Sequence, residues 1–185
     1  MTYKDAITQE YLKSILDYNS ETGIFIWLHR TLDMFEDDKQ SSSHRCNRWN
    51  AQYAGTVAGC KNNDGYIAIA IKPKNYRAHI LAWLYMTGEF PHKDIDHIDN
   101  DPCNNKFINL RLANDSQNHA NERLSKNNKS GFKGVYYNKQ NKKYRAQIMV
   151  NYKKKNLGSY ETAEEAHKAY QIAAQELFGE FANFG

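Results

Sequence analysis

Residues 96–118 constrain this chain more than any other part of its sequence. The stretch begins with an acid beside a histidine, Asp96 and His97, and two amide side chains follow at Asn109 and Asn118. Turn-forming residues fill the first half of the interval, and a short run of alternating apolar residues follows. This pattern predicts a hairpin with a long polar connection, and after it a polar segment that forms a helix.

These residue types suit hydrolysis of a phosphodiester beside a single metal ion. Asp96 and Asn118 offer the oxygen ligands that Mg²⁺ prefers, and water and phosphate oxygens would fill its remaining positions. His97 can take a proton from water because the ordinary pKa of an imidazole, about 6.5, lies close to neutral pH. Neighbours in an extended strand point to opposite faces, so we expect either a local distortion or a substrate that lies across the strand end.

An Asp–His pair alone can be accidental, but several separated groups of residues here resemble, in order, the HNH motif of phage-encoded homing-type endonucleases. The groups are Asp96-His97, Asn104-Asn105, Asn109-Leu110-Arg111 and Gln117-Asn118, preceded by the similar segments 64–66 and 77–83. The resemblance covers roughly residues 62–121. It implies a DNA endonuclease in which His97 is the general base, Asp96 and Asn118 bind the metal, and Asn109 pins the loop that holds His97.

Some residues near the motif allow more than one interpretation. Arg111 is a candidate accessory residue within the motif. His79 either faces the scissile strand or is a hydrogen-bonded packing histidine. A structural zinc site built from His44, Cys46 and Cys60 is conceivable, since some HNH nucleases carry one, but the cysteines lack paired spacing and free thiols are the default interpretation.

Size and composition limit the remaining possibilities. The 185 residues allow one or two small domains, and an apolar content of 41% is too high for a disordered chain. No apolar run of about 18 residues is present, and the N-terminal residues lack the pattern of a signal peptide. We therefore expect a protein without a membrane partner that stays in the cytoplasm, that of the bacterial host if a phage encodes it.

The net charge of +4 hides a strong asymmetry along the chain. Residues 123–158 contain eleven lysines and arginines and no acid, which leaves −7 for the rest of the net +4. A basic block on an otherwise acidic protein indicates contact with a polyanion such as nucleic acid. A basic face that is merely solvated usually includes some acids.

The chain ahead of the motif predicts alternating helices, strands and turns. We expect a helix over 8–18 capped by Thr8, a strand over 24–28, a long surface loop over 33–50 and a strand over 53–57. Solvation is the preferred interpretation of that loop, with DNA contact as the alternative through His44, Arg45, Arg48 and Trp49.

The following part of the chain carries clearer local signals. Asp64-Gly65 predicts a hairpin turn before a strand over 66–71. A helix over 79–87 is expected to end at Gly88, and a strand over 95–97 follows. After the motif hairpin, Asp115 or Ser116 is expected to cap a helix. A polar helix over 119–124 then runs into a small, basic stretch.

That stretch, residues 125–130, reads as a linker. It separates domain 1–124, with its motif core at 62–121, from domain 131–185. Short strands are expected over 132–138, 144–150 and 155–160. The capping box Thr162–Glu165 then begins a helix that runs to about Phe178. Its stripe of small residues would let it lie close against the sheet and leave the other face of the sheet free.

Residues 131–184 resemble the ethylene-response-factor (APETALA-type) DNA-binding domain. The matching segments are 134–135, 144–148, 157–160, 162–166, 169–170 and 177–182. The resemblance implies a three-stranded sheet in the major groove of DNA. Matched contact positions and neighbouring basic residues give the DNA-binding candidates Lys133, Tyr136, Lys139, Arg145, Gln147, Met149, Lys154 and Lys155. Lysine lacks the bidentate fork of arginine that reads guanine, so base preferences do not carry over.

The sequence thus predicts an α+β protein: a ββα-metal nuclease domain followed by a three-stranded antiparallel sheet and one helix. We expect a metal-dependent endonuclease that cuts double-stranded DNA at or near a site positioned by the C-terminal domain. It would use one Mg²⁺ or Mn²⁺ ion per active site. A monomer is expected and a dimer is left open. The alternatives are a catalytically inactive DNA-binding regulator and an RNA-directed protein; the intact site residues argue against the first, and the major-groove sheet against the second.

Overall fold

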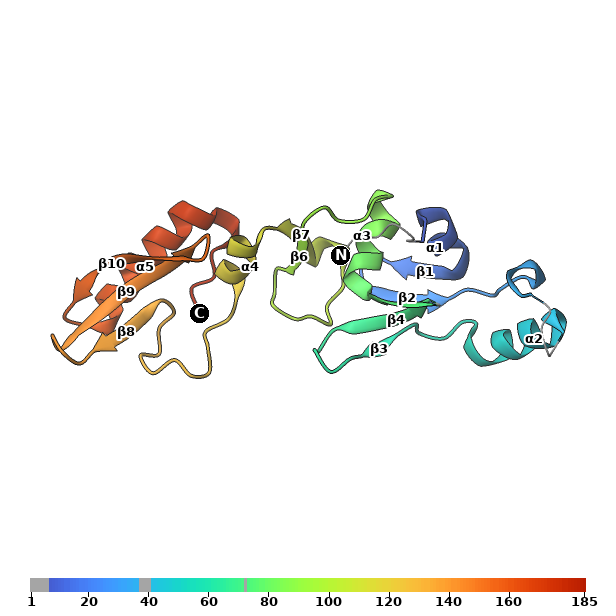
Figure 1. Ribbon diagram of the computed structural model, residues 1–185, viewed down its shortest axis with the longest axis horizontal. Helices are drawn as coiled ribbons and strands as arrows, with labels where there is room; N and C mark the ends of the chain where they lie inside the picture. The colour runs from blue at the N-terminus through green and yellow to red at the C-terminus, as the bar shows by residue number, and fades with distance from the viewer. Residues whose placement is uncertain (1–6, 37–40, 72) are drawn as a thin grey trace. The chain divides into compact units, whose positions relative to one another are not determined.

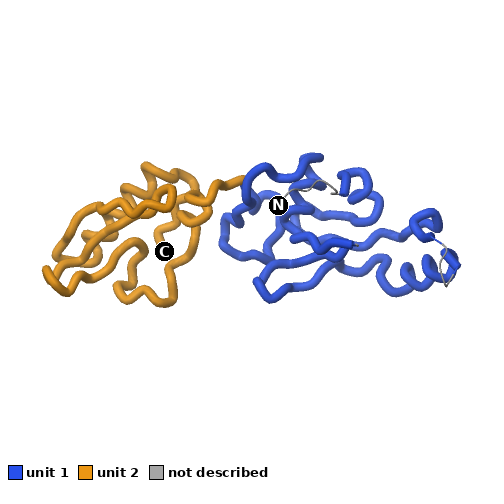
Figure 2. Tube along the Cα trace, in the orientation of Figure 1, with its two compact units in different colours: residues 1–111 blue, residues 112–185 orange. Residues whose placement is uncertain are grey.

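The computed structural model describes residues 7–36, 41–71 and 73–185. The chain divides into two compact units, residues 1–111 and 112–185 (Figures 1 and 2). This division falls ahead of the expected linker at 125–130, so residues 112–124 belong to the second unit. The domain bounds 1–124 and 131–185 stay a prediction. The predicted α+β class, with a small three-stranded antiparallel sheet and one helix in the C-terminal part, is confirmed.

The elements of the first unit, in chain order, are α1 (Gln9–Ile15), β1 (Leu16–Asn19), β2 (Ile24–Trp27), η1 (Leu32–Met34), α2 (Ser42–Tyr53), β3 (Cys60–Lys61), β4 (Ile67–Ile71), β5 (Lys74–Arg77), α3 (Ala78–Thr87), β6 (Asp94–His97), η2 (Phe107–Asn109) and β7 (Leu110–Ala113), whose last two residues extend into the second unit. The described strands pair as the hairpin β1–β2, the sheet β3–β4–β5 and the pair β6–β7.

The first helix is shorter than its sequence pattern predicts. Thr8 caps α1 as expected, because its hydroxyl accepts the N–H of Tyr11 at 3.1 Å. The prediction of a helix as far as residue 18 was wrong, since the chain turns into β1 after Ile15. Leu16 and Tyr18 are buried in β1 while the residues between and after them are exposed, which is the alternation of a strand.

The predicted surface loop over 33–50 was wrong as well. The range contains most of η1 and most of α2, while residues 37–40 lie outside the described part of the chain. Ser41 begins α2 by accepting the N–H of His44. Trp49 of α2 packs against Trp27 of β2, with ring centroids 5.6 Å apart, and the Arg30 guanidinium stacks 3.9 Å from the Trp49 ring.

The strand expected over 53–57 is also absent: α2 continues to Tyr53, and only Val57 forms an isolated bridge. The turn at Asp64-Gly65 is confirmed between β3 and β4. So is the end of α3 at Gly88, which adopts the left-handed conformation with φ 85°. No helix of the described residues has the length and apolar character needed to cross a membrane.

The elements of the second unit are α4 (Asp115–Asn121), β8 (Val135–Asn138), β9 (Lys143–Val150), β10 (Lys153–Tyr160), α5 (Ala163–Phe178) and η3 (Gly179–Phe181). The cap of α4 was predicted wrongly, and so was a helix over 119–124. Asn114, rather than Asp115 or Ser116, begins α4 in a reciprocal capping box with Gln117.

A three-stranded antiparallel sheet in the order β10–β9–β8 is covered on one face by α5 (Figure 1). Ala146 and Ile148 of β9 are buried beneath Ala166 and Tyr170 of α5. The close approach needs Gly134, because a Cβ there would lie 2.1 Å from the Tyr170 ring. The predicted stripe of small residues on the helix therefore packs on this sheet.

Candidate active site and nucleic-acid interface

Asp96 and His97 end strand β6, and both are buried, with exposed fractions of 5% and 7%. The carboxylate of Asp96 faces Arg111 on β7: Nε and Nη2 of the guanidinium each lie 2.9 Å from Oδ2. A buried carboxylate needs such a cationic partner, and this one also fixes the orientation of the group. Arg111, the accessory candidate from the motif, thus contacts the predicted metal ligand.

The imidazole of His97 faces Asn105, an asparagine of the polar connection. His97 Nε2 lies 3.3 Å from Asn105 Oδ1, and the amide of Asn105 donates from Nδ2 to the carbonyl of Cys103 at 3.2 Å. Because the amide nitrogen is used by Cys103, the oxygen faces the imidazole, and Nε2 must carry the proton. The lone pair of the neutral ring then lies on Nδ1.

The surroundings of His97 favour its neutral form. Burial lowers the pKa of the imidazole, and the hydrogen bond that the ring donates to Asn105 and the carboxylates Asp99, Asp96 and Asp101 offset this effect only in part. A neutral imidazole at neutral pH is the form that can act as a base.

Two aromatic rings from other elements pack around His97. The ring centroids of His79, from α3, and His97 lie 4.9 Å apart in an edge-to-face arrangement, and Tyr66 lies 5.3 Å from His79 and 6.1 Å from His97. His79 is 4% exposed, and Nδ1 of its ring has no hydrogen-bond partner among the described residues. Burial, then His97 and Arg77, lower the pKa of His79 to about 3. His79 is therefore a neutral ring packed against His97.

Asn109 ties the polar connection together from η2. Its Nδ2 donates to Asp99 Oδ1 at 2.9 Å and to the carbonyl of Asn104 at 2.8 Å, and its Oδ1 accepts the N–H of Asp99 at 3.1 Å. Its own carbonyl accepts the N–H of Ile98 at 3.0 Å. Four bonds from one buried residue fix the segment directly after His97.

The hairpin β1–β2 also supports the polar connection that follows His97. The Tyr18 hydroxyl donates to the carbonyl of Asn105 at 2.6 Å, and the N–H of Phe107 donates to the carbonyl of Ser20 at 3.0 Å. Gly23, with φ 74°, lies so close that a Cβ on it would be 2.4 Å from the carbonyl carbon of Asn105. The N-terminal hairpin therefore sets the position of the residue that orients His97.

Asn118, the second predicted metal ligand, lies in the middle of α4 in the second unit and is half-buried. A carboxylate oxygen from Asp96 and an amide oxygen from Asn118 are donors that suit Mg²⁺ or Mn²⁺, and such ions keep several water molecules or phosphate oxygens. Within the described ranges, no group of three or more histidine, cysteine, aspartate or glutamate side chains could hold a metal ion.

The structure gives no support to a zinc site at His44, Cys46 and Cys60. Cys46 is buried in α2, where its thiol donates to the carbonyl of Arg30 at 3.3 Å, while Cys60 is exposed on β3. His44 is exposed near the start of α2. All three cysteines are free thiols.

The sheet of the second unit sorts the candidate DNA-binding residues by face. Tyr136 pairs with Arg145, and Lys154 pairs with Met149, so these four side chains share the face away from α5. Gln147 alternates with the buried Ala146 and Ile148 and lies on the same outer face. The outer face thus carries Tyr136, Arg145, Gln147, Met149 and Lys154.

Lys155 and Lys139 are placed differently from those five. Lys155 pairs with Ile148 and so lies on the α5 side of the sheet, although it is exposed there, and Lys139 lies in the turn between β8 and β9. Within the outer face, Nε of Arg145 is buried and has no hydrogen-bond partner among the residues that the structure describes.

Lys133 does not reach the outer face. Its Nζ donates to the carbonyl oxygens of Ala120, at 2.6 Å, and Glu122, at the C-terminal end of α4. Burial lowers the pKa of Lys133 to about 8, and the charge of Glu122 acts against this effect. The ammonium group is thus used within the protein.

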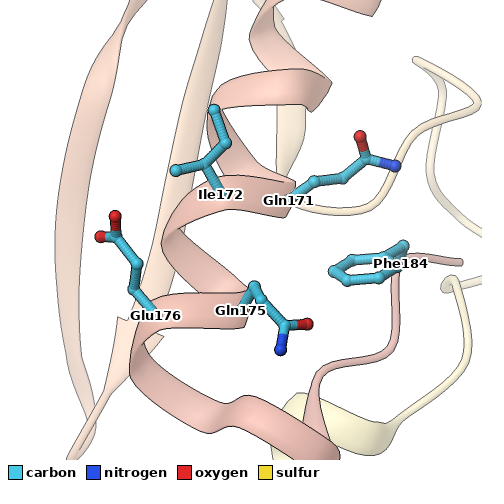
Figure 3. Close-up of a pocket in the computed structure, with 5 residues that line it drawn as sticks. All are labelled: Gln171, Ile172, Gln175, Glu176 and Phe184. Carbon is cyan, nitrogen blue, oxygen red and sulfur yellow. The ribbon is translucent and has the colours of Figure 1, made fainter.

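A shallow pocket on α5 holds none of the predicted site residues. Its walls are formed by Gln171, Ile172, Gln175, Glu176 and Phe184, and Figure 3 shows Phe184 facing this side of the helix. It presents one carboxylate and no arrangement of acid, base and nucleophile.

A buried Asp–His pair on a β-hairpin, an asparagine-pinned connection and a following short helix define the class of the HNH endonucleases. A family model described as HNH endonuclease matches residues 76–120, and one described as AP2 domain matches residues 130–180. The chain belongs to the HNH endonuclease family, with an AP2 domain in its second unit, and it is a DNA nuclease.

Two viral relatives accompany these matches. The chain is 36% identical over 109 residues to "Protein 3.8" of Escherichia phage T7, over 58% of this chain and 89% of the relative. It is 40% identical over 100 residues to "Uncharacterized HNH endonuclease L560" of Acanthamoeba polyphaga mimivirus, over 54% of this chain and 51% of the relative. The chain thus spans about half the length of the second relative. No solved structure matches.

The site contains residues whose roles the sequence did not predict. Asn105 belongs to the motif, but the sequence assigns it no role; in the structure it is the partner of His97. Nothing local in the sequence connects Tyr18 and Gly23 with Asn105, which lies more than 80 residues away. Tyr66, in the segment that precedes the motif, packs against both histidines.

Proposed function

We propose that this DNA endonuclease uses one Mg²⁺ or Mn²⁺ ion, held by Asp96 and Asn118, with His97 as the general base. The observation that carries the proposal is the setting of His97: a buried, neutral imidazole, bound through Nε2 by Asn105 and next in the chain to a buried carboxylate. HNH nucleases generally depend on a divalent metal. The choice between the two ions rests on the oxygen donors alone.

His97 would take a proton from the attacking water on Nδ1 as the water oxygen bonds to phosphorus. The bond from phosphorus to the 3′ oxygen would then break, and that oxygen would take up a proton from a water molecule, which leaves a 5′-phosphate and a 3′-hydroxyl. Asp96 and Asn118 would hold the divalent ion, whose positive charge would stabilise the negative charge that develops during hydrolysis. Asn105 fixes the proton on Nε2 throughout, so the proton-accepting nitrogen stays the same.

The residues around His97 keep it in place. Asn109 would hold the connection that carries Asn105, and Arg111 would hold the carboxylate of Asp96. His79 and Tyr66 would act as an uncharged wall behind the imidazole, because a charged neighbour there would shift its protonation.

The outer face of the AP2 sheet would place the substrate. Lys154 and Arg145 would contact phosphates, and an acceptor oxygen there would satisfy the buried Nε of Arg145. Gln147 and Tyr136 would lie nearer the bases. One chain carries all of the proposed residues, so we propose a monomer, and the phage relative supports action in the cytoplasm of a bacterial host.

The test is cleavage of plasmid and phage DNA with Mg²⁺, with Mn²⁺ and with EDTA, by the wild-type protein and by His97→Ala. Metal-dependent cutting should fall by about 10² to 10⁴ in the variant. DNA affinity in EDTA should be unchanged, since His97 contributes no charge to binding. Tight binding without cutting in any divalent metal would favour a DNA-binding regulator, and equal cutting by His97→Ala would refute the role of His97.

A further inference from the structure

We infer that the second unit, residues 112–185 and here called the AP2 unit, positions Asn118, because its sheet and its C-terminal residues hold both ends of the helix that carries this asparagine. The inference rests on the proposed function of Asn118 as a metal ligand. It assigns positioning roles to Ser116, in the first turn of α4, and to Asn183, which binds the last turn of this helix.

Helix α4 needs external support. It has seven residues, and helices shorter than about 12–15 residues are marginal in water without tertiary contacts. Ala120 of α4 and Ala113 just ahead of it are buried in one core with Ile148 of the sheet and with Tyr170 and Phe178 of α5. The helix is therefore built into the core of the AP2 unit.

The first turn of α4 is bound to the turn between β9 and β10. The hydroxyl of Ser116 accepts the N–H of Asn151 at 2.8 Å and donates to its side-chain oxygen at 3.1 Å. The hydroxyl of the next residue in that turn, Tyr152, donates to Asp115. Both turn residues have positive φ, 49° and 61°, which few non-glycine residues adopt. In this conformation the β9–β10 turn binds the first turn of α4.

That turn connects the two strands that would contact DNA. Met149 and Lys154, on the outer face, each lie two residues from it along the chain. Contacts at this end of the sheet would therefore reach the first turn of α4 through one short, strained turn.

The last turn of α4 is held from two other places. Lys133, ahead of β8, donates to the carbonyls of Ala120 and Glu122, which a helix end leaves without intrahelical partners. Asn183, near the C-terminus, donates from its N–H to the carbonyl of Ala120 and from Nδ2 to that of Asn121 at 2.9 Å. Asn118 lies between these two tethered ends.

The test is a full-length double variant, Ser116→Ala with Asn183→Ala, which removes side-chain bonds from both ends but touches neither the predicted ligands nor the outer face. A control, Ser14→Ala with Asn127→Ala, makes the same two changes at exposed positions away from α4. Ser116→Thr keeps the hydroxyl and should rescue the first end.

Hydrogen exchange is measured first, without metal or DNA. The amides of α4 should exchange about tenfold faster in the double variant, while those of β9 and α5 stay protected. In cleavage assays, the Mn²⁺ concentration for half-maximal rate should rise about tenfold, the range in which supporting residues tune metal sites. DNA affinity in EDTA should stay within about twofold of wild type, since the outer face is intact.

Unchanged exchange in α4 together with an unchanged Mn²⁺ requirement would overturn the inference. If the wild-type protein does not cut DNA in any divalent metal, the proposed function fails, and the exchange arm still decides whether the AP2 unit holds α4. If the double variant unfolds, Asn183→Ala alone carries the same two measurements.

Discussion

At the scale of single residues, the chemistry depends on which nitrogen of His97 bears a proton. Asn105 decides this, because its amide is locked by Cys103 and presents oxygen to Nε2. General-base catalysis contributes about 10² to 10⁴ to a rate, and an incorrectly protonated or rotated imidazole loses part of it. The uncharged rings of His79 and Tyr66, which pack against His97, also favour its neutral form.

Replacing Asn105 by alanine tests this assignment. We expect Asn105→Ala to lower kcat by about tenfold, a fraction of the general-base contribution, with DNA affinity in EDTA unchanged. Asn63→Ala, an exposed asparagine in the β3–β4 turn, is the matched control. A variant with wild-type kcat would show that the imidazole is oriented by other contacts.

A second residue-scale prediction concerns His79 and stability at low pH. The unfolded chain takes up a proton on His79 below about pH 6.5, whereas the folded protein, in which the pKa of His79 is lowered to about 3, does not. The free energy of unfolding should therefore fall as the pH drops from about 6.5 toward 3, by at most about 1.4 kcal/mol per pH unit from this group. The charged or titratable groups that face it are His97, Tyr66 and Arg77.

Thermal unfolding of His79→Phe between pH 4.5 and 7 would check this. Its melting temperature should depend less steeply on pH than that of the wild type, and His29→Phe, at an exposed position, is the control. Identical slopes in His79→Phe and wild type would contradict the effect.

At the scale of elements, the hairpin β1–β2 acts as a support for a connection far away in sequence. Gly23 allows this because it adopts positive φ and has no side chain where the backbone of Asn105 passes. Gly55 offers an unusual comparison: its φ of 78° is nearly the same, but a Cβ on it would meet nothing within 4 Å.

The pair of substitutions separates backbone strain from contact. Gly55→Ala should lower the free energy of unfolding by about 1–2 kcal/mol, because an L-residue must then adopt the left-handed conformation. Gly23→Ala should cost that and an additional 1–3 kcal/mol or so for overpacking, and it should lower kcat by moving Asn105. Denaturant unfolding and single-turnover cleavage measure the two effects. An equal loss of unfolding free energy in both variants would mean that the backbone at Asn105 moves aside without an energetic penalty.

Local signals in the sequence predicted some elements and not others. The end of α3 at Gly88, the β3–β4 turn and the capping box of α5 are written in a few adjacent residues, and all are present. Helix α2 was missed because it is polar on most sides and is held by a tertiary stack of Trp49 on Arg30. The last turn predicted for α1 was lost to pairing with β2, since pairing across a hairpin outweighs helical periodicity.

The residues of the candidate site also differ in whether the sequence alone reveals them. Asp96, His97, Asn109 and Asn118 could be named in advance because their identities and spacing form a motif. Asn105 as the partner of His97, and Tyr18 and Gly23 as its supports, could not, because these contacts arise only when distant segments fold together. The contacts of Lys133 could not be predicted either. Its match to a family contact position does not indicate that its ammonium group binds carbonyl oxygens at the end of α4.

At the scale of the whole molecule, the basic residues that would bind DNA and the Asp–His pair that would cut it lie in different units. The acid-free block of the sequence falls in the AP2 unit, while Asp96 and His97 belong to the first unit. The affinity for DNA, and its dependence on salt, should therefore be set mainly by the second unit.

Lys154→Ala is the simplest test of this division. Loss of one phosphate contact should reduce the slope of log affinity against log salt by about 1, while cleavage at saturating DNA stays near wild type. Lys168→Ala removes an exposed lysine from α5 and should leave the slope unchanged. Equal slopes in both variants and wild type would show that DNA does not meet the outer face of the sheet.

The embedding of α4 in the AP2 core also bears on how such proteins can be recombined. A chimera that joins this nuclease to a foreign DNA-binding module within residues 125–130 would strand Ala113 and Ala120 without Tyr170 and Phe178, and would leave the last turn of α4 without Lys133 and Asn183. The polar stretch over residues 125–130, which the sequence predicts as a linker, is thus a poor place to join the two parts. A fusion that exchanges everything after Arg111, and brings a helix with its own asparagine at the position of Asn118, respects the boundary that the fold itself draws.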